Sequence, residues 1–170
     1  MRPLTILGAV LIVLVALLIF GRTRRVWPAA MFLLMTFGTL AGAQVLKWLV
    51  QRDRPPLSAL ADPPPADPTF SFPSGHTTVV TVLVVALVLI VPRTWKWLTA
   101  MAGGVIVLIV AWTRVYLGSH YPSDVIASIL VGVAGVMLLR VLGAQLIVQP
   151  VLRMQARKRE VSGSVAQGSR

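Results

Sequence analysis

Five long apolar stretches, separated by short polar segments, constrain this chain more than any other feature of its sequence. They cover about residues 4–20, 26–50, 75–91, 97–113 and 124–148, and each is long enough, or nearly so, to cross about 30 Å of hydrocarbon as a helix. The 170 residues are 56% hydrophobic and 12% charged, and the mean hydropathy is +0.83, whereas soluble domains average about 45–50% apolar and about 25% charged residues. We therefore expect an all-α, polytopic transmembrane helical bundle of about five spans, and we exclude a soluble domain and a disordered chain.

The chain is expected to form one domain over residues 1–152, followed by a basic, disordered cytoplasmic tail over 153–170. The first apolar stretch is interpreted as a retained span, because no small-x-small cleavage site follows it and three arginines come directly afterwards. The proline-rich segment 61–68 cannot continue a helix and is expected to be an extended connection outside the membrane. This segment serves either as a spacer or as a cover for a polar pocket.

The formal net charge of +11 arises from 16 Lys and Arg against 5 Asp and Glu. Most of the cations follow the first, third and fifth apolar stretches, which places them on one side of a five-span topology. Cytoplasmic loops carry the excess of Lys and Arg, so we expect the N-terminus outside and the C-terminus in the cytoplasm, across the inner (cytoplasmic) membrane. Since no soluble fold accompanies the excess, we assign it to topology and to anionic lipid rather than to nucleic acid.

The ionisable residues on the opposite, outer side are the informative ones, because charged groups at membrane ends are costly and usually functional. They come from three separate segments, which indicates a shared polar pocket. These residues are Lys47, Arg52, Asp53, Arg54, His76, Arg114, His120 and Asp124.

The first of these segments ends the second apolar stretch and carries two cations. We expect Lys47 and Arg54 to lie on one side of the outer end of a helix that Pro55 stops. Taken alone, both cations fit residues at the membrane interface whose side chains extend to the lipid headgroups. Positive charge is scarce on this side of a membrane, so the pair also suits an anionic ligand.

The second segment, Pro73 to His76, directly precedes the third apolar stretch. Ser74 is expected to cap the helix, and Gly75 lets the backbone approach a ligand closely. The exposed N–H groups and the positive end of the helix dipole then form an anion site. His76 would lie at its rim, and histidine is the residue type whose proton equilibrium lies near neutral pH. A simple helix cap is the alternative.

The third segment runs from Thr113 to Asp124. Pro122 suits the first position of the last span, which places Asp124 in the first helical turn. His120 comes just before, and a nearby carboxylate would fix its tautomer and raise its basicity, leaving the other ring nitrogen to attack or to take a proton. A helix cap beside an interfacial histidine is the alternative.

Together, the patterns Lys-x6-Arg-Pro, Pro-Ser-Gly-His and Arg-x5-His-x3-Asp resemble the three-part signature of the type 2 phosphatidic acid phosphatase (PAP2) superfamily. The resemblance covers Lys47 to Asp124, close to half of the chain. Thr113 stands where the family's third motif usually has Ser, and a hydroxyl is kept. Members of the family commonly have six spans, so one N-terminal span fewer is expected here.

The resemblance implies a lipid phosphatase that works through a phosphohistidine. By this analogy, His120 is the nucleophile, Asp124 orients it, and His76 protonates the leaving oxygen and then activates water. The phosphoryl oxygens, whose charge must be stabilised during transfer, would be held by Lys47, Arg54, Ser74, Gly75 and Arg114.

No metal and no cofactor are expected, because zero cysteines remove thiolate sites and the five carboxylates form no cluster suited to Mg²⁺. A site at the outer interface between apolar helices suits a lipid phosphate or diphosphate. The bacterial character of the motifs favours undecaprenyl diphosphate, and phosphatidylglycerol phosphate, phosphatidic acid and diacylglycerol diphosphate are alternatives. Vanadium haloperoxidases share these residues but are soluble and larger. A non-enzymatic transporter or assembly factor could bind anions with the same cluster.

Overall fold

The computed structural model describes residues 2–24, 26–56, 69–150 and 154, and these residues form an all-helical fold, as the sequence predicts. The expected segments 61–68 and 153–170 lie outside the described residues, apart from Met154. The five main helices are α1 (Arg2–Thr23), α2 (Val26–Val50), α3 (Gly75–Ile90), α4 (Lys96–Tyr116) and α5 (Pro122–Gly143). A short 3₁₀-helix, η2 (Arg93–Trp95), precedes α4, and a π-helical turn, η3 (Ala144–Val148), continues α5.

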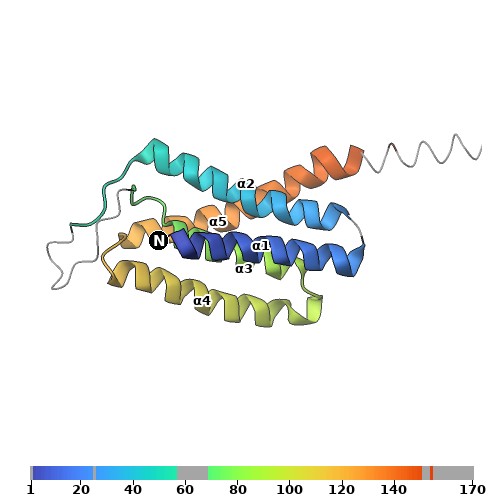
Figure 1. Ribbon diagram of the computed structural model, residues 1–170, viewed down its shortest axis with the longest axis horizontal. Coiled ribbons are helices and arrows are strands. Elements are labelled where there is room, and N and C mark those ends of the chain that lie inside the picture. Colours follow the sequence, from blue (N-terminus) through green and yellow to red (C-terminus); the bar gives the residue numbers. More distant parts are fainter. Residues whose placement is uncertain (1, 25, 57–68, 151–153, 155–170) are drawn as a thin grey trace, which may run out of the picture.

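The helices run up and down along one common axis, so that consecutive helices are antiparallel (Figure 1). Helix α3 contacts each of the other four and is therefore the central helix. Its 16 residues extend over about 24 Å, against about 37 Å for the 25 residues of α2. A short helix suits this position because its neighbours, rather than lipid, cover its sides.

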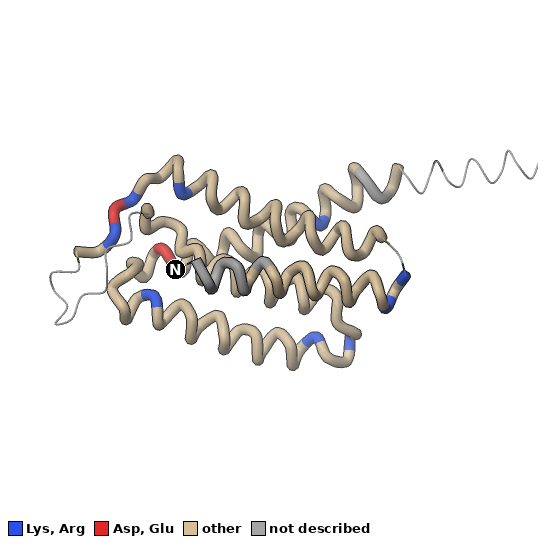
Figure 2. The backbone as a smooth tube through the Cα atoms, viewed as in Figure 1, with Lys and Arg blue, Asp and Glu red and all other residues tan. Residues whose placement is uncertain are grey.

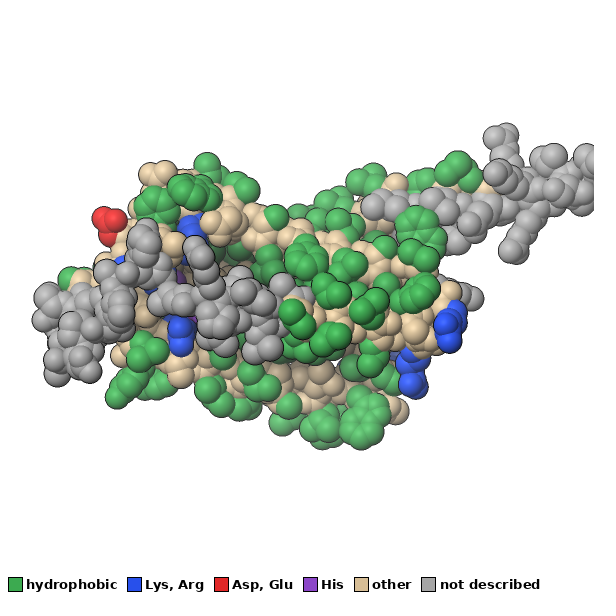
Figure 3. Space-filling view, in the orientation of Figure 1, with side chains coloured by type: hydrophobic (Ala, Val, Ile, Leu, Met, Phe, Trp, Pro, Cys, Tyr) green, Lys and Arg blue, Asp and Glu red, His purple; other side chains and the backbone are tan. Residues whose placement is uncertain are grey.

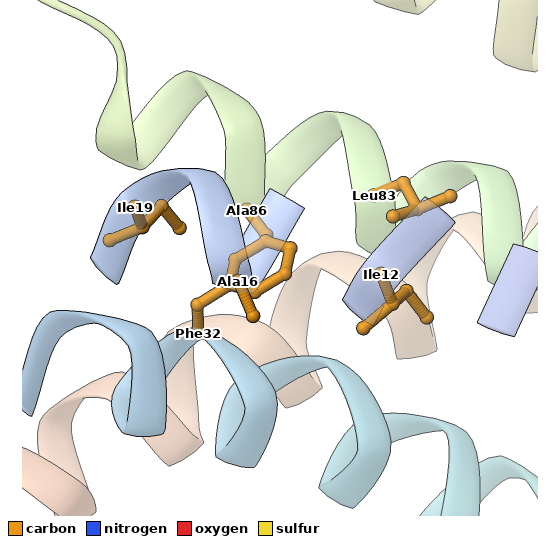
Figure 4. Close-up of a cluster of buried hydrophobic side chains, with 6 residues drawn as sticks. All are labelled: Ile12, Ala16, Ile19, Phe32, Leu83 and Ala86. Carbon is orange, nitrogen blue, oxygen red and sulfur yellow. The ribbon is translucent and has the colours of Figure 1, made fainter. Parts of the chain in front are cut away.

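The core lies where α1, α2 and α3 meet. Figure 4 shows Phe32 of α2, which is fully buried, among side chains of α1 and α3. The buried members of this cluster are Ile12, Ala16, Ile19, Phe32, Leu83 and Ala86. A second cluster of Met35, Val82 and Val136 joins α2 and α3 to α5. The bundle is thus packed around α3.

The outer surface of the bundle is apolar. Leu108, Trp112 and Leu130 are 64%, 70% and 64% exposed, and Figure 3 shows such side chains along the sides of the molecule. Lys and Arg gather towards the two ends of the bundle (Figure 2). Large apolar side chains that face outwards between two charged ends fit a bundle that is embedded in lipid.

Three helical segments are long and apolar enough to cross a membrane: Val26–Val50, Arg93–Tyr116 and Pro122–Leu146. The apolar segments Val10–Thr23 and Gly75–Ile90 are shorter. The predicted five helices are therefore present, and by length and composition three of them meet the requirement for a full span. The chain is an integral membrane protein.

Candidate active site

The polar segments singled out by the sequence meet at one end of the bundle, where α2 and α4 end and α3 and α5 begin (Figure 1). Helix α2 ends at Val50, because Gln51 adopts a left-handed conformation with a φ of 49° while its N–H still donates to the Lys47 carbonyl at 3.1 Å. The prediction that Arg54 continues this helix as far as Pro55 is therefore wrong. The left-handed turn at Gln51 redirects the chain before Pro55 is reached.

Lys47 and Arg54 nevertheless reach the same segment, Thr69 to Ser71. Lys47 Nζ donates to the Phe70 carbonyl at 2.6 Å. Arg54 donates to the Thr69 carbonyl and to Thr69 Oγ1, both at 2.8 Å, and its Nη1 reaches the Ser119 carbonyl at 2.9 Å. Tertiary contacts, not helical spacing, thus bring the two cations together.

The start of α3 differs from the expected capping arrangement. Ser74 occupies the N-cap position, but its hydroxyl makes no capping hydrogen bond. Ser74 is fully buried, and its backbone N–H donates to Ser128 Oγ of α5 at 2.7 Å. The Ser74 side chain accepts a hydrogen bond from Thr77 at 3.1 Å. Ser74 therefore lies in the packing between α3 and α5.

The turn between α4 and α5 brings the third motif back to the same place. Gly118 has a φ of 61°, a conformation that side chains rarely adopt, and it lets the chain reverse after α4. Pro122 begins α5, as predicted, and Asp124 lies in its first turn. The Asp124 carboxylate accepts the Tyr121 N–H at 2.9 Å, which caps the helix.

The Asp124 side chain accepts three hydrogen bonds and is fully buried. Its Oδ1 accepts a hydrogen bond from Arg52 Nη1 at 2.8 Å. Its Oδ2 accepts the Tyr121 N–H and also the Ser71 hydroxyl. His120 Nδ1 lies 3.7 Å from Oδ2, beyond ordinary hydrogen-bond length, and the two groups form an ion pair only when the ring is protonated.

A cavity of about 640 Å³ opens among these segments. Its wall includes both histidines of the chain and six of the eight predicted site residues, namely Lys47, Arg54, Gly75, His76, Arg114 and His120. Apolar side chains of four helices, among them Leu11, Leu40, Leu83 and Val110, form much of the remaining wall. The wall also includes the polar residues Gln44, Thr69, Thr78, Thr113 and Ser119. Ser74 and Asp124, the other two predicted residues, lie behind this wall.

Arg114 stands out among the cations of the cavity. Its Nε is buried and has no hydrogen-bond partner among the described residues. A buried guanidinium donor without a partner is costly, so a ligand oxygen at this position would relieve the cost.

His120 is buried, and its surroundings favour the neutral ring. Burial lowers the pKa of His120 from the ordinary value of 6.5 to about 4, and the Arg54 and Lys47 cations act in the same direction. The Ser71 backbone and the Asp124 carboxylate raise the pKa without offsetting these effects. At neutral pH the ring therefore keeps a lone pair, which a nucleophile requires.

Sequence reasoning placed Arg52 on the outer side but assigned it no role, and it did not consider Ser71 or Ser128. Arg52 and Ser71 bind the two oxygens of Asp124, and Ser128 joins α5 to the start of α3. Arg52 was recognisable as a cation next to the first motif. Nothing in the local pattern marks the two serines.

The fold and the cavity define the class of protein: a helical membrane bundle in which two histidines and three cations line one cavity. The chain belongs to the PAP2 superfamily, whose family model matches residues 27–146. This confirms the resemblance that the three motifs indicate.

Two curated relatives illustrate the similarity. The chain is 36% identical over 121 residues to an undecaprenyl-diphosphatase of Sulfolobus acidocaldarius, which covers 68% of this chain and 54% of that protein. It is 34% identical over 143 residues to phosphatidylglycerophosphatase B of Bacillus subtilis, which covers 78% of this chain and 68% of that protein. The chain thus spans about half of the first relative and about two thirds of the second.

A solved structure supports the same assignment. The crystal structure of a transmembrane PAP2-type phosphatidylglycerolphosphate phosphatase from Bacillus subtilis matches 80% of this chain and 71% of that one, with a TM-score of 0.66 and 28% identity. The two proteins therefore share the arrangement of their helices over most of their length.

Proposed function

We propose that this chain is a membrane lipid phosphatase that hydrolyses a phosphomonoester or diphosphate on a lipid through a phosphohistidine. One observation carries the proposal: a single cavity is lined by both histidines of the chain, by Lys47, Arg54 and Arg114, and by apolar side chains of the surrounding helices. The polar groups suit phosphoryl oxygens, and the apolar wall suits a lipid tail.

In the proposed reaction, His120 attacks phosphorus, and the bond from phosphorus to the leaving oxygen breaks. His76 donates the proton that this oxygen needs, which leaves a phosphohistidine on His120. His76 then takes a proton from water, whose oxygen attacks phosphorus and releases His120 and inorganic phosphate. Asp124, 3.7 Å from His120 Nδ1, orients the ring so that Nε2 makes the attack.

The phosphoryl oxygens would be bound by the three cations and by the backbone at the start of α3. Gly75 opens this helix, where N–H groups and the dipole favour an anion. A methyl group added at Gly75 would meet nothing within 4 Å, so there is room for a ligand against its backbone. Ser74, which is buried against Ser128, would support this backbone rather than contact the substrate.

Undecaprenyl diphosphate is the substrate we propose first, because one named relative is an undecaprenyl-diphosphatase. Phosphatidylglycerol phosphate is the second candidate, because another relative and the matching crystal structure bear that activity in their names. Phosphatidic acid and diacylglycerol diphosphate complete the panel to be tested. All four place a phosphate at headgroup depth and a tail in lipid.

The test is phosphate release by the purified full chain in detergent, for wild type, His120→Ala and His76→Ala across this panel. Wild type should release phosphate, and both variants should lose nearly all turnover. Arg93→Gln, at the opposite end of the bundle, is the matched control and should behave as wild type. No release from any substrate would indicate an anion-binding transporter or assembly factor, and unchanged turnover in His120→Ala would remove it as nucleophile.

The site is proposed to face the outside of the inner membrane, with the C-terminus in the cytoplasm. Arg22, Arg24, Arg93 and Lys96 lie at the helix ends opposite the site, and such an excess marks the cytoplasmic side. The chain has no cysteine, so single substitutions Asp53→Cys and Thr94→Cys can be labelled with a membrane-impermeant maleimide. In intact spheroplasts Asp53→Cys should react and Thr94→Cys should not, and the reverse pattern would invert the topology.

We also propose that residues 1–152 form the phosphatase domain and that the reaction needs no metal ion or other cofactor. Five carboxylates and no cysteine in the whole chain offer a poor set of metal ligands. The three cations and the helix N-terminus can instead supply the positive charge that phosphoryl transfer requires.

A further inference from the structure

Arg52 is held against the start of α5 by three separate contacts. Its Nη1 donates to Asp124 Oδ1 at 2.8 Å and to Ser123 Oγ at 2.7 Å. Its guanidinium carbon lies 4.0 Å from the centre of the Tyr121 ring, a cation–π distance. The Arg52 carbonyl also accepts the Ser71 N–H at 2.7 Å, and the Ser71 hydroxyl donates to Asp124 Oδ2. Arg52 therefore binds one carboxylate oxygen and anchors the residue that binds the other.

Arg52 differs in position from the cations of the cavity. The cavity wall includes Lys47, Arg54 and Arg114 but not Arg52. The Arg52 side chain is 37% exposed, whereas Asp124 is fully buried. Arg52 thus reaches the carboxylate from outside the cavity and is not placed to touch a phosphate.

A buried carboxylate is stable as an anion only when donors or a cation compensate for its lost hydration. Among the described residues, Arg52 is the Lys or Arg that contacts Asp124 directly. Without it, the buried carboxylate would be left with an uncompensated charge. Among the described residues, the other ionisable groups of the cavity wall are Lys47 in the last turn of α2, Arg54 beyond the end of α2, His76 of α3 and Arg114 of α4. The Lys47 and Arg54 cations oppose protonation of His120.

We propose that Arg52 is a positioning residue of the phosphatase reaction: it compensates the charge of the buried Asp124 carboxylate and fixes that carboxylate in place, so that His120 is held in one orientation. This inference rests on the proposed function. It separates Arg52, which acts through Asp124, from Arg54 two residues later, which lies in the cavity wall.

The experiment compares wild type with Arg52→Gln, Arg52→Lys and, as a matched control, Asp53→Asn, an exposed neighbour. Arg52→Gln should lower kcat by about tenfold to a hundredfold, the range expected for loss of a hydrogen bond to a charged group, with KM changed less than about twofold. The acidic limb of the pH profile of kcat should move upwards, because loss of a cation beside the site makes protonation there easier. Asp53→Asn should match wild type.

Arg52→Lys tests whether loss of the positive charge causes the changes in kcat and in the pH profile. A single Arg52 nitrogen makes both the Asp124 and the Ser123 contacts, so an ammonium can replace it. This variant should restore the wild-type position of the acidic limb and most of kcat. Thermal melting in detergent shows which variants are folded, and an NMR titration of His120 gives a second readout that does not depend on turnover.

Each outcome of this experiment supports or rejects the positioning role of Arg52. Absence of turnover in wild type would reject the proposed function, and with it this inference. If wild type is active, an unchanged kcat and pH profile in Arg52→Gln would reject the positioning role alone. A rise in KM at constant kcat would make Arg52 a substrate ligand instead. If Arg52→Gln does not fold, the result for Arg52→Lys is used. A folded Arg52→Lys whose acidic limb lies where that of wild type lies supports the proposal. A shifted acidic limb in Arg52→Lys, or loss of folding in both variants, rejects it.

Discussion

The proton equilibrium of His120 gives the sharpest prediction about this site. With its pKa lowered to about 4 from the ordinary 6.5, the ring is about 97% neutral at pH 5.5, whereas an unperturbed histidine is about 9% neutral at that pH. The fraction of the histidine that is neutral, and so able to act as a nucleophile at pH 5.5, therefore differs by about tenfold between the two cases. The reason is physical: a charged imidazolium would lose its hydration by burial and would face the Arg54 and Lys47 cations.

The measurement is direct because the chain has two histidines. In His76→Gln, the one remaining histidine is His120, and ¹³C-labelled histidine in detergent micelles gives a single ring signal to follow between pH 3 and 8. The midpoint should fall near pH 4. Adding Arg54→Gln should raise it, because one of the cations that oppose protonation is lost, whereas Arg93→Gln at the far end should leave it unchanged.

A midpoint at or above pH 6 in the folded protein would refute the reasoning, since burial and the two cations would then have no net effect on the pKa of His120.

The same proton equilibrium of His120 also predicts how the stability of the fold depends on pH. Because the folded-state pKa lies below the unfolded one, the unfolded chain binds a proton first as the pH falls from about 6.5 towards about 4. The melting temperature should fall over this interval, and less so in His120→Gln.

Three further predictions concern the absence of a metal requirement, the role of one cation and the packing of the helices. Phosphate release should survive EDTA, and full loss that Mg²⁺ restores would contradict a metal-free reaction. Arg114→Gln should raise KM by about tenfold or more, because a substrate oxygen loses a charge-assisted hydrogen bond, and an unchanged KM would remove Arg114 from the binding site. Gly103→Ala should destabilise the fold by about 1–3 kcal/mol, because the new methyl would lie 2.9 Å from Val84 Cγ2. Gly104→Ala, which meets nothing within 4 Å, should be neutral or stabilising by up to about 1 kcal/mol, and equal melting temperatures would refute the packing argument.

The helices were predictable because their cause is local. Val26–Val50 agrees with the expected stretch at both ends, and Pro122 opens α5 as its fixed φ suggests. The prediction that this helix runs beyond the apolar stretch to Pro55 was wrong, because Gln51 adopts a left-handed conformation that is unusual for this residue type. Ser74 kept the N-cap position but makes no capping bond, and its hydroxyl instead accepts a hydrogen bond from the Thr77 side chain.

The environment of Asp124 and His120 depends on residues far apart in the chain. Arg52 reaches Asp124 across 72 positions, and Ser71 reaches it across 53. No periodicity connects such residues, because hydrogen bonds between elements follow from how whole helices pack. Sequence spacing therefore identified Asp124 as the partner of His120 without showing that Arg52 and Ser71 bind its two oxygens.

By itself, the sequence determined that this chain is a membrane-embedded helical bundle, that it belongs to the PAP2 superfamily, and that its charged residues divide between two ends. Hydropathy and short motifs carry that information, because transfer to lipid and helix formation act on consecutive residues. Only the tertiary structure decided which groups share one cavity, why His120 stays neutral, and how Arg52 compensates the charge of Asp124. Burial and electrostatic interaction depend on distances in space, which packing around α3 sets.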